Sequence, residues 1–143
     1  MVKNRIYLDS CCFNRPYDDQ TNLNVHLETK AKIFIQNEIL NKNFELVWSF
    51  MMDYEISFNP FLDRKIAFSH WKNIATVNVK PIEKNLLKGI EITQKNIKKK
   101  DALHIACAIE AECECFLTTD KKILNKNIQE IILINPLDFI RHF

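Results

Sequence analysis

Glycine is almost absent from this sequence, since Gly89 is the only one among 143 residues, and proline occurs only four times. No Pro/Ser/Gly-rich linker, repeat or low-complexity tract divides the chain, so residues 1–143 are expected to form a single domain. Turns must then depend on asparagine, which tolerates left-handed backbone conformations better than most residues. The asparagines expected to serve turns are Asn14, Asn41, Asn43, Asn59, Asn78 and Asn135.

Long hydrophobic runs are also missing, and none approaches the ~20 residues that a membrane helix needs. Residues 1–5 lead directly into a four-residue apolar strand, which is too short for the core of a signal peptide. We therefore expect a cytoplasmic protein without membrane association. The five cysteines lack the usual structural-zinc spacing and are expected to be reduced and mostly buried, although a four-thiolate site remains a minor alternative.

A strong excess of one charge is lacking too, because the formal net charge is only +2. Global electrostatics therefore gives no argument for nucleic-acid binding. The local distribution is more informative, because lysines at 95 and 98–100 precede Asp101 and lysines at 121, 122 and 126 follow Asp120. Basic residues beside an acidic centre suit a polyanion, whereas the simpler alternative is a solvated charged face.

Apolar segments of two kinds alternate along the chain. Short runs at residues 5–9, 44–48, 76–79, 115–118 and 130–134 are typical of strands. Helical periodicity and capping signals predict five helices, over residues 24–40, 49–58, 61–73, 81–92 and 101–112. A short helix is expected to begin at residue 120 and a final helix after residue 136. Residues 11–19 are expected to be a loop. This alternation predicts an α/β fold, a three-layer α/β/α sandwich around a mainly parallel sheet of about four to five strands.

Four acidic residues fall where such a fold would gather them. Asp9 and Asp120 each follow an apolar strand, and Glu55 and Asp101 lie on predicted helices. Each has a simpler interpretation by itself, as a turn former, a helix cap, a first-turn acid or an exposed helix acid. Their joint placement at the carboxyl edge of a parallel sheet instead predicts a site for Mg²⁺ or Mn²⁺, because several carboxylates repel one another unless a cation neutralises them.

Four segments carrying these acids resemble the four acidic motifs of PIN-domain proteins, in the family's order and at about its spacing. They are residues 6–10 (IYLDS), 48–55 (WSFMMDYE), 100–108 (KDALHIACA) and 116–120 (FLTTD). The resemblance implies a PIN-like fold with Asp9, Glu55, Asp101 and Asp120 as the catalytic, metal-binding quartet. It also implies that the hydroxyls of Ser10 and Thr118 hold a carboxylate or a metal-bound water in place.

The same resemblance implies a function. PIN domains are metal-dependent nucleases, and many are ribonuclease toxins of the VapC type. We therefore expect an endoribonuclease that leaves a 5′-phosphate and a 3′-hydroxyl, with RNA as the preferred nucleic acid. An antitoxin protein and a second copy of the chain are the protein partners left open. Two features depart from the pattern. Glu112 stands where many members have glycine, so the helix that begins at Asp101 is expected to end without a left-handed cap. The segment of residues 11–19 is longer than the corresponding turn of a short toxin.

Further residues near the acids are candidates for substrate contact. They are Asn14, Arg15, Lys98, Lys99, Lys100, His104 and Lys121. Asn14 and Arg15 could equally fix their loop. His104 could touch the site or a phosphate, and its simpler interpretation is a partly buried histidine whose hydrogen bonds go to the backbone.

Two other functions are compatible with an acidic α/β sandwich. A phosphoacceptor receiver domain needs an aspartate at the end of a central strand, but the strand here ends in Trp48-Ser49. A non-catalytic module that binds RNA or a protein is the second alternative, and the intact quartet argues against it.

Overall fold

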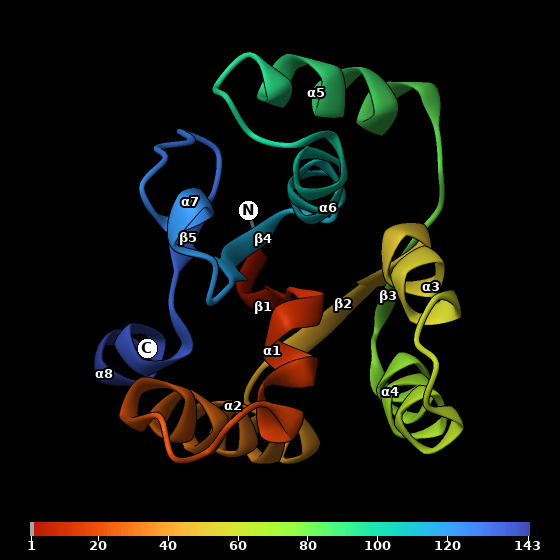
Figure 1. The fold of residues 1–143 in the computed structure, drawn as a ribbon. Helices are drawn as coiled ribbons and strands as arrows, with labels where there is room; N and C mark the ends of the chain where they lie inside the picture. The colour runs from red at the N-terminus through yellow and green to blue at the C-terminus, as the bar shows by residue number, and fades with distance from the viewer. Residues whose placement is uncertain (1) are drawn as a thin grey trace.

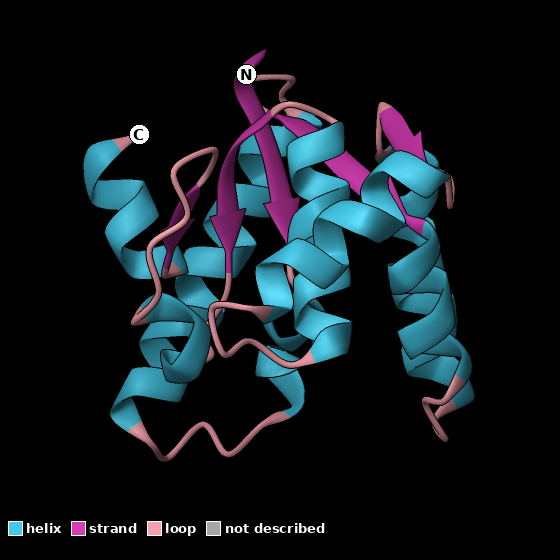
Figure 2. Cartoon of the chain, turned by 90° about the horizontal axis from the view of Figure 1, so that it is seen from above, coloured by secondary structure: helices cyan, strands magenta, loops and turns pink. Residues whose placement is uncertain are grey.

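A single parallel sheet forms the centre of the protein. The computed structural model describes residues 2–143, with side chains described from residue 4 onward. The sheet has five strands in the order β3-β2-β1-β4-β5, and every pairing is parallel. The strands are β1 (Val2–Leu8), β2 (Glu45–Ser49), β3 (Val77–Val79), β4 (Cys113–Leu117) and β5 (Ile132–Ile134). Figure 2 shows neighbouring strand arrows pointing the same way, so the carboxyl ends of the strands share one edge.

Helices cover both faces of this sheet. They are α1 (Ser10–Asn14), the short 3-10 helix η1 (Arg15–Tyr17), α2 (Leu23–Leu40), α3 (Phe50–Ser57), α4 (Leu62–Ile74), α5 (Glu83–Thr93), α6 (Lys99–Glu110), α7 (Lys121–Leu124) and α8 (Pro136–His142). Figure 1 shows α5 and α6 on one side of the sheet and α2 and α8 on the other. The predicted three-layer α/β/α sandwich is confirmed. Within the described residues, no helix is both long and apolar enough to cross a membrane.

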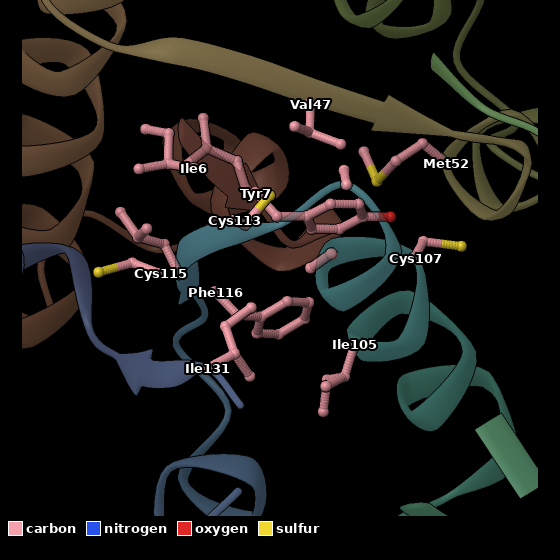
Figure 3. Packing of buried hydrophobic residues seen from close by; sticks show 14 of the residues in the cluster. Ile6, Tyr7, Val47, Met52, Ile105, Cys107, Cys113, Cys115, Phe116 and Ile131 are labelled. Atoms are coloured by element: carbon pink, nitrogen blue, oxygen red, sulfur yellow. The ribbon is translucent and has the colours of Figure 1, made fainter. Parts of the chain in front are cut away.

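The core lies on both faces of the central strands, which explains why these strands are almost continuously apolar. Tyr7 and Phe116 stack from neighbouring strands with ring centroids 5.3 Å apart. Figure 3 shows the Tyr7 ring projecting from β1 toward α6, among other buried side chains. Burial of each large apolar side chain stabilises the fold by roughly 1.5–3 kcal/mol, so the central strands hold the carboxyl edge in place.

Short polar side chains set where several helices begin. The hydroxyl oxygen of Ser49 accepts hydrogen bonds from the backbone N–H groups of Met51 (3.2 Å) and Met52 (3.4 Å), which confirms the predicted cap of α3. Asp9 likewise accepts from the Ser10 N–H at the start of α1, and Asp120 from the Lys122 N–H at the start of α7. Two of the predicted site carboxylates therefore also act as helix caps.

Several sequence predictions were wrong in detail. The segment expected to be a loop, residues 11–19, contains α1 and η1, because Asp9 caps a helical turn there and Pro16 starts the next. Left-handed backbone occurs at Asn4, Lys42, Asn96 and Glu112, and at none of the six asparagines expected to serve turns, although Asn41 and Asn135 do stand at helix ends. Glu112 itself takes the left-handed conformation (φ 58°), and α6 has the left-handed end that it was expected to lack.

The cysteines agree with a reduced protein. All five are free, and Cys12, Cys107, Cys113 and Cys115 are buried. Burial raises the pKa of Cys107 and of Cys115 to about 12, so these thiols stay protonated at neutral pH.

Candidate active site

Asp9 lies at the end of β1 and is buried, with 4% of its surface exposed. One carboxylate oxygen accepts the Ser10 N–H (2.8 Å), and the other accepts the hydroxyl of Thr118 (2.9 Å) and the thiol of Cys11 (3.4 Å). Burial raises the pKa of Asp9, and the negative charge of Glu55 adds to the rise. The positive charge of His104 and the hydrogen bond from Thr118 oppose the rise. Asp9 is therefore well oriented but lacks a full counter-charge.

Thr118 joins the first and last acidic segments. It follows β4, is completely buried, and donates its hydroxyl to Asp9 while accepting the N–H of Asp120 (3.1 Å). Because β1 and β4 are neighbours in the sheet, their carboxyl ends bring Asp9 and Asp120 to the same place. The Thr118 hydroxyl therefore holds the Asp9 carboxylate and the backbone of Asp120.

Asp101 lies in the first turn of α6 and is half-buried. Its pKa is raised by burial first, and then by the negative charges of Asp9 and Asp120 and, more weakly, of Glu55; the charge of His104 opposes the rise. Asp101 therefore lies within electrostatic reach of the other three predicted acids. Their mutual repulsion is the feature that a cation would relieve.

Glu55 projects from α3 and is held at both oxygens. One accepts the Nε2 proton of His104 (2.7 Å), and the other accepts the hydroxyl of Ser10 (2.5 Å). Burial by itself would raise the pKa of Glu55, but the hydrogen bond and charge of His104, the Ser10 hydroxyl and the charge of Lys100 lower it overall. The Ser10 hydroxyl therefore supports Glu55, although the resemblance placed it beside the first acid, Asp9.

His104 touches the site but does not contact a phosphate from it. Of the expectations that it would touch the site or a phosphate, or be partly buried with backbone partners, only the first holds: it is completely buried and both ring nitrogens meet side chains, Tyr7 and Glu55. A substrate cannot reach it. No local signal in the sequence could reveal the pair, because His104 and Glu55 are 49 residues apart.

Arg15 is also withdrawn from substrate contact. Its guanidinium bonds to Glu28 on α2 (2.8 Å) and to Asp18 (3.0 Å), so it fixes the segment after α1. Asn14 remains close to the acids, because it lines a small cavity of about 30 Å³ together with Ser10 and Glu55. Of the two alternatives left open for this pair, Arg15 has the structural one.

The lysines predicted to meet substrate are exposed. Lys99 and Lys100 form the first turn of α6, Lys98 caps it, and Lys121 begins α7. Lys98 and Lys122 line a cavity of about 420 Å³ that also contains Asp101 and Asp120. Lys122 was not among the predicted contacts, and it lies on α7 two residues after Asp120.

Carboxylate oxygens are the ligands that the quartet offers to a metal ion. In residues 2–143, no group of three or more His, Cys, Asp or Glu side chains is placed so that it could hold a metal ion. The donor set nevertheless consists of carboxylate oxygens, and burial first, with neighbouring carboxylates adding to it, raises the pKa of Asp9 and of Asp101. Such donors fit Mg²⁺ or Mn²⁺, because Mg²⁺ is commonly held by one or two carboxylates together with waters and substrate phosphates.

Comparison with known proteins was made by sequence and by structure. No protein-family model matches the chain, and no curated protein matches it in sequence. A solved structure does match: a chain of the crystal structure described as VapBC2 from Rickettsia felis bound to a DNA fragment from their promoter. The two chains are 17% identical with a TM-score of 0.57, and the match covers 92% of this chain and 98% of that chain. The likeness confirms the PIN-like fold and bears on the fold alone.

Proposed function

We propose that this protein is a divalent-metal-dependent endoribonuclease and the toxin of a toxin–antitoxin pair. The observation that supports the proposal is that Asp101 is within electrostatic reach of Glu55 and of Asp9 and Asp120, the last two at the carboxyl edge of a PIN-like sheet. Ligands of open α/β folds bind at that edge. The fold by itself would not be enough, because one fold serves many functions.

The residues of the chain have distinct roles in this proposal. Asp9, Asp101 and Asp120, with Glu55, would hold Mg²⁺ or Mn²⁺. A bound divalent ion would lower the pKa of a water molecule and offset negative charge on the scissile phosphate. Thr118 and Ser10 orient Asp9 and Glu55 through their hydroxyls. Lys98 and Lys122 lie beside Asp101 and Asp120, where phosphates flanking the scissile bond can be bound.

End-labelled RNA incubated with Mn²⁺, with and without a chelator, tests this proposal. We expect cleavage that leaves 5′-phosphate ends, that the chelator abolishes, and that Asp101→Asn reduces by about 100-fold or more. Single-stranded DNA of the same sequence should be cut more slowly. Cleavage that resists the chelator, or RNA binding by the parent without any cleavage, would contradict the proposal, the latter in favour of a binding module.

Asp53→Asn is the matched control because Asp53 lies two residues from Glu55 but faces elsewhere. It accepts the indole N–H of Trp48 (2.9 Å) and pairs with Lys72 (3.2 Å). We expect this variant to cleave RNA at the parent's rate. If instead it lost activity while Glu55→Gln did not, the assignment of the second acid would be wrong.

A protein partner belongs to the same proposal. Large apolar side chains on α3, α4 and the connection between them are exposed, namely Tyr54, Phe58, Phe61, Leu62 and Ile66. Exposed apolar side chains on two helices that contact each other favour an interaction site. Because the structural neighbour comes from a VapBC2 complex, we propose that an antitoxin covers this surface and blocks cleavage. Co-expression with the product of the adjoining reading frame should give an inactive complex, and Phe58→Asp with Leu62→Asp should prevent its formation.

A further inference from the structure

A chain of buried hydrogen bonds leads from the sheet to the acidic site. The hydroxyl of Tyr7 on β1 lies 2.6 Å from the Ser49 hydroxyl and 2.6 Å from Nδ1 of His104. Nε2 of His104 lies 2.7 Å from Glu55, whose other oxygen accepts from Ser10. Tyr7, Ser49 and His104 are completely buried, so water does not compete for these groups.

The protons in this chain can be placed from donor and acceptor chemistry. An ionised carboxylate only accepts hydrogen bonds, so Nε2 of His104 must carry the proton that it shares with Glu55. Nδ1 then either accepts the Tyr7 hydroxyl proton or, in the imidazolium, donates to the Tyr7 oxygen. In both arrangements the Nε2–H points at Glu55, because the Tyr7 contact fixes the plane and rotation of the imidazole ring.

The same chain also fixes the helix that carries Glu55. Ser49 both contacts Tyr7 and caps α3, so the start of α3 is tied to β1. Further along α3, Glu55 is held from α6 by His104 and from α1 by Ser10. The Glu55 carboxylate is therefore held directly from α6 and α1, and its helix is tied to β1. A purely structural histidine would need partners, but it would not need to hold a carboxylate that faces the other acids.

We infer that His104 is a positioning residue for Glu55, held in place by Tyr7 and Ser49, and that it acts on metal binding only through Glu55. The inference rests on the proposed function, since it concerns a metal-binding carboxylate. Loss of such an outer partner typically weakens metal affinity by about 10- to 100-fold. His104 thus has the role of an internal support and is not a substrate contact.

Two substitutions of His104 test the roles of its two ring nitrogens separately. In His104→Gln the amide nitrogen reaches about the place of Nε2 and can still donate to Glu55. In His104→Asn the amide reaches about the place of Nδ1 and keeps only the Tyr7 contact. Mn²⁺ binding to the full chain, measured without RNA from the free-Mn²⁺ electron paramagnetic resonance signal, should show His104→Gln within about 3-fold of the parent and His104→Asn weaker by about 10-fold or more.

The test is completed in a Glu55→Gln background. If His104 acts only through Glu55, His104→Asn should cause no further loss of Mn²⁺ affinity there. Equal affinity of the parent and both single variants, or a loss from His104→Asn that persists in the Glu55→Gln background, would overturn the inference while leaving the proposed function intact. A parent chain that binds no Mn²⁺ would overturn the proposed function and this inference with it.

Thermal unfolding of each metal-free variant shows whether it folds. If His104→Asn does not fold, Tyr7→Phe takes its place, because it keeps the stacked ring and removes only the hydroxyl that orients Nδ1. The inference is supported if Tyr7→Phe binds Mn²⁺ several-fold more weakly than the parent and causes no such loss in the Glu55→Gln background. Unchanged Mn²⁺ affinity of Tyr7→Phe overturns it.

Discussion

The Thr118 hydroxyl donates to the carboxylate of Asp9 at 2.9 Å, across the carboxyl ends of two neighbouring strands. The same oxygen accepts the N–H of Asp120 at 3.1 Å. One buried hydroxyl therefore sets the orientation of the first acid and the backbone that leads to the last one.

Thr118→Val should separate this role from simple packing. Valine keeps the shape but leaves Asp9 with one donor fewer and the Asp120 N–H unpaired, which should lower the free energy of unfolding by about 1–3 kcal/mol. Urea denaturation without metal measures this loss, and Mn²⁺ affinity should fall as well. Thr119→Val, at the adjacent half-buried position, is the control and should change both quantities little.

Asp9→Asn should abolish metal-dependent cleavage without loss of metal-free stability. The raised pKa of Asp9 means that the folded state disfavours its charged form. That cost is absent below the ordinary pKa of a carboxyl group. It grows as the pH rises from that ordinary pKa to the raised pKa of Asp9 in the folded protein, so the parent loses stability between these two pKa values. Because asparagine carries no charge and can still cap α1, the variant should be at least as stable as the parent at pH 7. Urea denaturation of both proteins at pH 4 and pH 7 measures this; marked destabilisation of Asp9→Asn would make Asp9 a structural residue.

Much of the fold was predictable because the strands are short and apolar and the helices carry clear starts, such as Ser49 before α3. The strand order was not, because nothing local decides that β1 pairs with both β2 and β4. Residues 11–19 were misassigned because a short capped turn followed by Pro16 lacks helical periodicity. The four acids could be proposed from their places in the elements, whereas the Tyr7–His104–Glu55 contacts depend on how α3 and α6 pack together.

Lys32 should make stability depend on pH in the opposite direction from Asp9. It is 8% exposed, its amino group lies 5.8 Å from the centre of the Phe13 ring, and burial lowers its pKa to about 8, with the charge of Cys12 opposing the shift. Between pH 8 and the ordinary value of 10.5 the unfolded chain binds more protons, so stability from this group rises with pH. Lys32→Met should therefore be more stable than the parent at pH 7, and the gap should shrink by about 3 kcal/mol between pH 8 and 10.5.

Denaturation of both proteins with reductant present measures that gap, because the buried thiols contribute equally to each. Lys30→Met, on the same helix but exposed, should show no such pH dependence. A constant difference between Lys32→Met and the parent at all pH values would mean that Lys32 is not perturbed by burial.

Glu112→Gly should stabilise the protein. Glu112 adopts φ 58°, a conformation that costs a residue with a side chain about 1–2 kcal/mol and glycine much less. We expect a gain of about 1 kcal/mol in the free energy of unfolding. Glu114→Gly, two residues on within β4, should instead lose stability. A loss from both substitutions would show that Glu112 makes contacts that outweigh its backbone strain.

Lys98→Gln with Lys122→Gln should weaken RNA binding and reduce its salt dependence. Each lysine that meets a phosphate of a single strand contributes about 0.7 to the slope of log affinity against log salt, so the pair should remove about 1.4. Binding is measured with uncleaved RNA and the Asp101→Asn chain. Lys30→Gln with Lys42→Gln is the control, because neither lysine lines the cavity with Asp101 and Asp120. Identical slopes for both pairs would mean that RNA binds elsewhere.

The central claim is that the four carboxylates form one metal site, and anomalous X-ray scattering from a crystal grown with Mn²⁺ tests it most directly. We predict a Mn²⁺ peak at the carboxyl edge of the sheet, within ligand distance of Asp9 and at least one of Asp101 and Asp120, and absent from crystals of Asp9→Asn. A Mn²⁺ peak only elsewhere on the protein, or an unchanged peak in the Asp9→Asn crystal, would contradict the account.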